Sequence, residues 1–437
     1  MAASEPHVGP ARELTLRILK ELAGSAPLQR VRIRLWDGSY WPENAPDSVP
    51  ATVVLHHPGA LREMLLANSE AALGEAYLQN DFDVEGDMEA VFELGDLISH
   101  QTAGWSKKLN MAHLLWQLPG RPEQEKPANR RAVLSEEPHS PARDRSAVQF
   151  HYDLSNDFYG LWLDSARVYS CAYFQSEAEP LESAQRHKLD MLCRKLGLRP
   201  GHRLLDIGCG WGGLIEHAAA HYGVRATGIT LSERQAEYAQ ERLCALGLQD
   251  RAEVRLQDYR TAEGEEAYDA VVSVGMVEHV GRKNLPLYFS AAHRLLKPGG
   301  VFLNHGIGTG AVPTLQCGAS FVDAYVFPDG DLFPISAMNA PAEEAGFEIR
   351  DVENLREHYA LTLRHWVQRL ETRHEEALAF VSEPVYRTWR LYMAGAAHRF
   401  KIGQLAVYQT LLAKLHANGV ANVPLNRAAW YRPGERQ

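Results

Sequence analysis

Short apolar runs alternate with longer amphipathic stretches through the second half of the chain. The runs predict strands at residues 203–207, 225–229, 254–256 and 268–274, and a Pro298-Gly299-Gly300 turn predicts a fifth strand over 301–304. Helical patterns separate the runs, for example over residues 232–246. Strands that alternate with helices indicate a parallel, doubly wound, Rossmann-like α/β sheet. Such a sheet binds its ligands beyond the carboxyl ends of its strands, so chemistry is expected directly after each strand.

A smaller α+β pattern precedes this region. It predicts a helix at 11–22, strands at 31–36 and 52–56, a helix at 58–67, and a turn at 81–87 that leads into a last helix. The segment 117–145 then holds five prolines and many charged residues, which is typical of a linker. We therefore expect an N-terminal domain over 1–117, a linker over 118–145 and an α/β domain over 146–437.

Composition narrows the classes of function. The 437 residues are 45% hydrophobic and 23% charged, which fits a globular protein, and the net charge of −10 argues against nucleic acid as the main partner. No apolar run is long enough for a membrane span, and the charged N-terminus has no signal-peptide core, so a cytoplasmic location is expected. The five cysteines are scattered and form no C-x-x-C pair, so neither a disulfide framework nor a metal site is expected.

A glycine-rich turn follows the first strand of the α/β region. Gly208, Gly210 and Gly213 formally match a dinucleotide-binding fingerprint, in which an acidic residue closes the second strand. That strand instead closes with Thr230, Leu231 and Ser232. With Asp206 two residues before the first glycine, the turn resembles that of class I S-adenosylmethionine-dependent methyltransferases, which we favour.

Several separated motifs resemble the cyclopropane-fatty-acyl-phospholipid synthase family, which includes the mycolic acid cyclopropane synthases. The motifs occur in order between residues 146 and 410: HYDLSNDFY at 151–159, YSCAY at 169–173, SVGMVEHVG at 273–281, NHGIG at 304–308, YVFPDG at 325–330 and HYALTL at 358–363. The resemblance implies transfer of a methylene group from S-adenosylmethionine to the cis double bond of an unsaturated phospholipid acyl chain. In this family the resulting carbocation loses a proton to bound bicarbonate, and a cyclopropane ring closes.

The resemblance also implies a residue for each role. The bicarbonate site would comprise Cys171, Glu278, His305, the backbone of Ile307, and Tyr359. The cofactor site would comprise Tyr169, Ser170, Asp206, Gly208, Gly210, Thr230, Leu231, Ser232, Gln235, Asp258 and Tyr259. The rings of Tyr152, Tyr173, Tyr325 and Tyr359 would stabilise a cation if they face the site.

Some of these residues have a structural alternative. Cys171 taken alone fits a core position, Asp258 can cap a turn, and Ser232 with Gln235 forms a helix capping box. Trp211 is expected to pack behind the glycine turn. Cys193, Cys244 and Cys317 are interpreted as structural.

The substrate implies contact with a membrane. Basic and aromatic residues alternate over 356–401, which suits either an anionic lipid surface or an ordinary amphipathic helix with a solvated face. The resemblance further implies that residues 1–117 form a lipid- and membrane-docking domain, and that the protein is a homodimer at the inner face of the membrane. Two other functions stay open: a family methyltransferase that makes a methyl-branched or methylene-bearing chain or methylates a small molecule, and a catalytically silent lipid-binding protein.

Overall fold

The structure is a computed structural model that describes residues 8–24, 30–44, 46, 48–101, 105–122, 131–132, 134–152, 154–313 and 319–431. The chain forms two compact units. The small unit comprises Met1–Ala132, Leu315–Pro328 and Val381–His398, and the large unit comprises Val133–Thr314, Asp329–Phe380 and Arg399–Gln437. The small unit thus takes two segments from the second half of the sequence.

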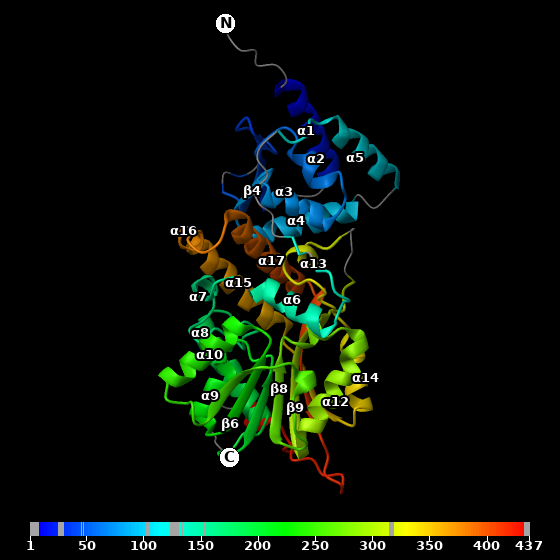
Figure 1. Ribbon diagram of the computed structural model, residues 1–437. Helices are drawn as coiled ribbons and strands as arrows, with labels where there is room; N and C mark the ends of the chain where they lie inside the picture. Colours follow the sequence, from blue (N-terminus) through cyan, green and yellow to red (C-terminus); the bar gives the residue numbers. More distant parts are fainter. Residues whose placement is uncertain are drawn as a thin grey trace. The chain divides into compact units, whose positions relative to one another are not determined.

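The small unit is built on a four-stranded sheet of order β2-β1-β3-β4 (Figure 1). Its strands are β1 (Val31–Arg34), β2 (Tyr40–Trp41), β3 (Ala51–Leu55) and β4 (Phe82–Gly86). Its helices are α1 (Val8–Ala23), α2 (Ala60–Leu65), α3 (Glu70–Leu78), α4 (Met88–Gln101), α5 (Trp105–Gln117), α13 (Phe321–Tyr325) and α17 (Glu383–Lys401, up to His398). An N-terminal α+β arrangement was therefore correctly expected.

The turn predicted at 81–87 is wrong, because this segment forms strand β4. Phe82 and Val84 are buried, whereas Asp83 and Glu85 alternate with them on the opposite side. The strand lies at the edge of the sheet, where charged side chains reach solvent and protect the edge. The acidic residues of this segment therefore give a sequence pattern typical of a turn, although they belong to a strand.

The basic stretch at 356–401 supplies buried structural contacts as well as surface charge. Arg387 and Arg390 on α17 are each 8% exposed. Arg387 donates to the Tyr77 carbonyl and to Asp83, and Arg390 donates to the Tyr77 hydroxyl and the Val84 carbonyl. These two guanidinium groups therefore stabilise the small unit and are not available to a lipid surface.

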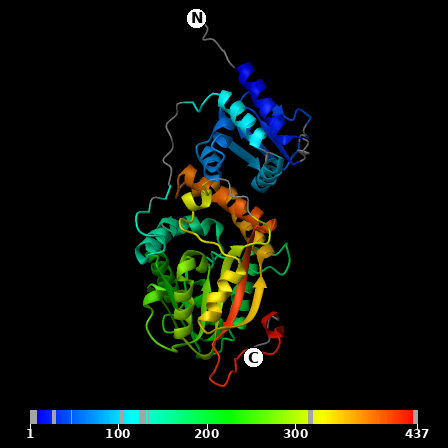
Figure 2. The ribbon, with the colours of Figure 1, turned by 90° about the vertical axis from the view of Figure 1, so that its right-hand side faces the viewer.

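The large unit contains a seven-stranded sheet of order β10-β11-β9-β8-β5-β6-β7. Five strands run parallel, as expected: β5 (Arg203–Ile207), β6 (Arg225–Thr230), β7 (Ala252–Leu256), β8 (Tyr268–Val274) and β9 (Leu296–Thr309). Strand β9 includes the residues of the predicted Pro298-Gly300 turn, but its pairing with β8 shifts register there, from Leu296 opposite Tyr268 to Val301 opposite Ala270, and Gly299 has a φ of +79°. The sequence pattern also missed β10 (Glu348–Asn354) and β11 (Leu405–Ala413), which pair antiparallel beside β9 (Figure 2).

Helices cover both faces of this sheet (Figure 1). One core joins the strands to α8 (Leu181–Lys195), α9 (Gly213–Tyr222) and α10 (Glu233–Ala245). A second core joins them to α12 (Leu285–Leu295) and α14 (Ile335–Glu344). The remaining helices are α6 (Pro141–Tyr152), α7 (Asn156–Trp162), η1 (Tyr259–Thr261), α11 (Val277–Val280), η2 (Arg282–Asn284), α15 (Arg356–Thr372), α16 (His374–Ala377) and α18 (Ala428–Tyr431). This is the doubly wound α/β arrangement that the sequence predicts.

Part of the predicted linker falls outside the described residues, namely 123–130 and 133, as do Asp153 and Cys317. Helix α6 begins at Pro141, within the last residues of that segment. The domain limits at 117 and 146 stay predictions. Among the helices of the described residues, none is long and apolar enough to cross a bilayer.

Candidate active site

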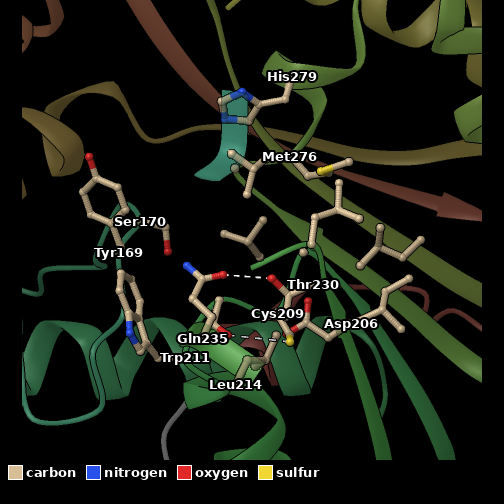
Figure 3. Close-up of a pocket in the computed structure, with 18 of the residues that line it drawn as sticks. Tyr169, Ser170, Asp206, Cys209, Trp211, Leu214, Thr230, Gln235, Met276 and His279 are labelled. Atoms are coloured by element: carbon tan, nitrogen blue, oxygen red, sulfur yellow. Dashed lines mark hydrogen bonds between the residues drawn. The ribbon is translucent and has the colours of Figure 1, made fainter. Parts of the chain in front are cut away.

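A pocket opens in the large unit at the carboxyl ends of β5, β6 and β8 (Figure 3). Nine of the eleven predicted cofactor residues line it: Tyr169, Ser170, Asp206, Gly208, Gly210, Thr230, Leu231, Gln235 and Tyr259. Figure 3 shows Tyr169 and Trp211 on one side of the pocket, Asp206 and Thr230 on the other, and Gln235 between them. The parallel strands bring these residues together although 90 positions separate them in sequence.

The glycine turn between β5 and α9 forms one wall. Gly208 and Gly210 have φ angles of +80° and +55°, which side-chain-bearing residues rarely adopt. Gly228 on β6 lies so close to the turn that an added Cβ would lie 2.7 Å from the Cys209 sulfur. The three glycines therefore let the backbone approach both the ligand space and the neighbouring strand.

Asp206 ends β5 directly before this turn. Its side chain is 3% exposed, and its Oδ1 atom is buried without a hydrogen-bond partner among the described residues. Burial raises the pKa of Asp206 to about 7, and the nearby Lys188 cation opposes that rise. A buried acceptor of this kind is typical of a carboxylate that awaits a ligand donor.

Lys188 is a pocket residue that the sequence analysis did not identify. It is 1% exposed, and its Nζ donates to the Ser170 hydroxyl at 2.9 Å. Burial lowers the pKa of Lys188 to about 8, with the negative charges of Asp164 and Asp206 opposing the shift. The signal in the sequence was a lysine at helical spacing from Leu181 and Leu192, on the face of α8 that is buried.

The start of α10 orients Gln235. The Thr230 hydroxyl donates to Gln235 Oε1 at 2.9 Å, so Gln235 Nε2 faces the pocket and has no partner in the described part of the chain. Ser232 is the helix cap, since its hydroxyl accepts from the Gln235 backbone at 3.3 Å, and it does not line the pocket. The amide nitrogen of Gln235 is thus a donor that a ligand can use.

Asp258 also caps a helix rather than lining the pocket. Its carboxylate accepts from the Arg260 backbone at 2.9 Å and pairs with the Arg260 guanidinium. That guanidinium reaches Asp144 of α6 at 3.0 Å. The next residue, Tyr259, lines the pocket. Burial raises the pKa of Tyr259 to about 12, so its hydroxyl stays protonated.

Three predicted anion-site residues lie on or directly after the neighbouring strands β8 and β9. Glu278 on α11 follows β8, and His305 and Ile307 lie on β9. The Ile307 backbone donates to Glu278 Oε1 at 2.6 Å. Glu278 Oε2 and His305 Nε2 are both buried, and neither has a hydrogen-bond partner within the described ranges. Two such atoms, one on α11 and one on β9, fit a small polar ligand that would bind both.

Burial decides the charge of both side chains. It raises the pKa of Glu278 to about 7 and lowers the pKa of His305 well below its ordinary value, so the imidazole is neutral. Glu278 Oε1 accepts from the Ile307 backbone, so the donor that the family resemblance assigns to the anion is already engaged.

The other two predicted anion-site residues lie at the start of α15. The Cys171 thiol donates to the Leu355 carbonyl at 3.7 Å, and the Tyr359 backbone nitrogen donates to the same carbonyl at 3.1 Å. Burial raises the pKa of Cys171, so the thiol is neutral. None of the five anion-site residues is among the described residues that line the cofactor pocket, and their union in one site stays a prediction.

The predicted tyrosines are divided between different surroundings. Tyr152 lines the pocket, and Tyr359 packs on Phe400 with ring centres 4.7 Å apart. Tyr173 stacks on His358, also at 4.7 Å. Tyr325 belongs to the small unit, where its hydroxyl donates to Glu75 at 2.7 Å.

Trp211 was expected to pack behind the glycine turn. It is 2% exposed and lines the pocket, and its indole nitrogen donates to Asn156 at 2.8 Å. The hydrogen bond fixes the indole plane, so its ring becomes part of the wall rather than support behind it.

Known proteins resemble this chain over most of its length. The family model described as mycolic acid cyclopropane synthetase matches residues 139–410, and one described as a domain of unknown function matches residues 18–99. The chain is 38% identical over 405 residues to a probable fatty acid methyltransferase of Pseudomonas putida, which covers 92% of this chain and 96% of that protein. It is 39% identical over 270 residues to the cyclopropane-fatty-acyl-phospholipid synthase of Escherichia coli K12, which covers 62% and 68%. The crystal structure of mycolic acid cyclopropane synthase CmaA1 complexed with SAH and CTAB aligns with a TM-score of 0.58 at 37% identity, over 61% of this chain and 97% of that one.

Proposed function

Because the chain belongs to the mycolic acid cyclopropane synthetase family of S-adenosylmethionine-dependent methyltransferases, we propose that it builds cyclopropane rings on phospholipid acyl chains. The methyl carbon of S-adenosylmethionine would bond to a cis double bond, and loss of one proton would close the ring. Net addition is one CH2 group, with S-adenosylhomocysteine as the second product. A 37% identical relative was crystallised in complex with SAH, which supports the choice of cofactor.

The observation that carries the ring-closing step is the pair of unpartnered atoms, Glu278 Oε2 and His305 Nε2. Both are buried, Glu278 on the helix that follows β8 and His305 on the neighbouring strand β9, and they suit a small anion such as bicarbonate. Bound there, bicarbonate would supply a compact proton acceptor. Below about pH 7 the protonated Glu278 would donate to it from Oε2, and the neutral His305 would orient it.

The cofactor pocket supplies positioning. Asp206 Oδ1 and Gln235 Nε2 are an unpartnered acceptor and donor, which suit the polar groups of S-adenosylmethionine. An alkene is a weak nucleophile, so holding it in line with the methyl group must supply much of the rate. Rings such as those of Tyr152 and Trp211 in the pocket wall would exclude water and tolerate positive charge.

A phospholipid substrate requires contact with a membrane surface, which we place at the inner face. In the small unit, α5 exposes Leu109 and Trp116, each at 69%, together with exposed Lys107 and Lys108. Apolar and basic side chains on one helix suit an anionic interface. We therefore place the membrane contact on α5 and not on Arg387 and Arg390. The homodimer stays a prediction.

The proposal is tested with the full chain, methyl-labelled S-adenosylmethionine and vesicles of cis-unsaturated phospholipid. We expect lipid products one CH2 heavier, with cyclopropane protons in their NMR spectra. His305→Ala and Glu278→Ala should lose turnover while retaining S-adenosylhomocysteine affinity. His293→Ala is the matched control, because His293 packs on Phe347 away from the pocket lining.

Other outcomes would identify the alternatives. A heavier lipid without a ring would show the methyl-branched or methylene product, which the P. putida relative's name, fatty acid methyltransferase, makes the second candidate. If the label appeared in a small molecule while the lipid stayed unmodified, the substrate would be that small molecule and not a membrane lipid. Cofactor binding without any transfer would refute the enzyme. Unchanged turnover after bicarbonate removal would refute the anion's role.

A further inference from the structure

A buried chain of polar side chains lies behind His305 in the large unit. Gln409 on β11 is directly opposite His305 on β9 in the strand register. The Gln409 amide nitrogen lies 3.2 Å from His305 Nδ1, and its Oε1 accepts from Lys195 Nζ at 2.9 Å. All three side chains are at most 3% exposed. Neither Lys195 nor Gln409 was a candidate from the sequence.

The chemistry of lysine settles the direction of these contacts. An ammonium group only donates, so the Gln409 atom facing Lys195 must be the amide oxygen. The amide nitrogen therefore faces His305, and it too only donates. His305 Nδ1 must then be an acceptor and carry no hydrogen.

The remaining hydrogen of the imidazole follows from its charge. Burial lowers the pKa of His305, and the cations of Lys188 and Lys195 lower it further, so the ring is neutral. A neutral imidazole carries one hydrogen, which must be on Nε2 when Nδ1 accepts. Nε2 is the buried atom without a partner among the described residues.

We propose that Lys195 and Gln409 are positioning residues that hold His305 in the tautomer with its hydrogen on Nε2, where it donates to the bound anion. This inference rests on the proposed function and adds two residues to it. His305 then has no free lone pair and is not the base that removes the methyl proton. That proton goes to the anion, which His305 only orients.

Two carboxylates beside Lys195 stabilise the hydrogen bonds that run from Lys195 through Gln409 to His305. Its ammonium pairs with Glu353 and lies 3.8 Å from Asp351. These two carboxylates offset the cost of burying the ammonium group, which donates to Glu353 and to Gln409. Lys195 therefore holds the Gln409 amide on the side opposite His305. If the amide rotated by half a turn, its NH2 group would face the Lys195 ammonium, and both groups are donors.

The tautomer is measured directly in the full-length protein labelled with 15N-histidine. The chain has 19 histidines, so the His305 signals are identified by subtracting the spectrum of His305→Ala. We expect Nε2 to carry the hydrogen and Nδ1 to be bare. Gln409→Glu presents only acceptors to the ring and should move the hydrogen to Nδ1. A bare Nε2 in the parent protein would overturn the proposal, whatever the lipid assay shows.

A second readout separates positioning from folding. Gln409→Leu should raise the bicarbonate concentration for half-maximal turnover about tenfold or more. Without Gln409 the hydrogen of His305 is no longer held on Nε2, where it donates to the charged ligand. Its S-adenosylhomocysteine affinity should stay unchanged. Thr410→Val is the matched control, since Thr410 is buried on the same strand and contacts Asn339 instead. Equal loss of bicarbonate dependence and cofactor affinity in Gln409→Leu would make Gln409 a folding residue only.

Discussion

Replacing Glu278 by glutamine should stabilise the protein increasingly as the pH rises. Burial raises the pKa of Glu278 from 4.5 to about 7, so the folded protein holds a proton that the unfolded chain has already released. Stability is therefore fully present below about pH 4.5 and falls as the pH rises toward 7. Glutamine keeps the acceptor for the Ile307 backbone and cannot ionise, so Glu278→Gln escapes this loss.

The expected size follows from the pKa. Each factor of ten in an ionisation constant corresponds to about 1.4 kcal/mol. The raised pKa then costs the folded protein about 3 kcal/mol once both states are ionised, and we expect the advantage of Glu278→Gln to grow by about 2–3 kcal/mol between about pH 5 and about pH 8. Above about pH 8 the difference should level off, because folded and unfolded Glu278 are then both charged.

Urea unfolding at a series of pH values, followed by tryptophan fluorescence, measures this difference. Buffers are free of bicarbonate, because a bound anion would add its own linkage. Glu375→Gln is the control, since Glu375 is 95% exposed and its replacement should give a difference that does not change with pH. A constant difference for Glu278→Gln, or one that shrinks as the pH rises, would refute the assigned environment of Glu278.

Two further predictions concern the cofactor pocket. Gly228→Ala should weaken S-adenosylhomocysteine binding in calorimetry by about 1–3 kcal/mol, since the new Cβ would lie 2.7 Å from Cys209 and displace the glycine turn; unchanged affinity would show that the turn yields without consequence. Lys188→Met removes the cation that opposes the raised pKa of Asp206, so the pH midpoint of S-adenosylhomocysteine binding should move upward. A midpoint that stays in place would mean that Asp206 ionisation does not control binding.

Local pattern was enough to predict the parallel half of the sheet. The strand at Tyr268–Val274 agrees at both ends, because a run of apolar residues bounded by polar ones has few other conformations in a folded chain. Ser232 as a helix cap is equally local, since the residues it joins are three positions apart. Nine cofactor residues followed from the position of strand ends and from the family resemblance.

Non-local pairing was not predictable in the same way. Strand β10 carries alternating charges at a sheet edge, and β11 reaches β9 from about 100 residues away. Arg387 contacts Tyr77 across 310 positions, so its sequence neighbours say nothing of its burial. Gln409 was unpredictable for the same reason. A polar residue in a mostly apolar strand gains a role in the site only when folding places it opposite His305.

Asp206 and Glu278, two of the buried carboxyl groups of the large unit, have different partners, and this difference fits different roles. Burial raises the pKa of Asp206 to about 7, and the nearby Lys188 cation opposes that rise and so favours the ionised, accepting form. Glu278 receives only backbone hydrogen bonds, so burial favours its protonated, donating form at neutral pH and below. With His305 also neutral, an anion between them would be held by uncharged donors. A cationic partner would bind the anion more tightly but would stabilise its charge and make it a weaker base. A site that must remove a proton from a methyl group therefore benefits from the low pKa of His305 and the raised pKa of Glu278.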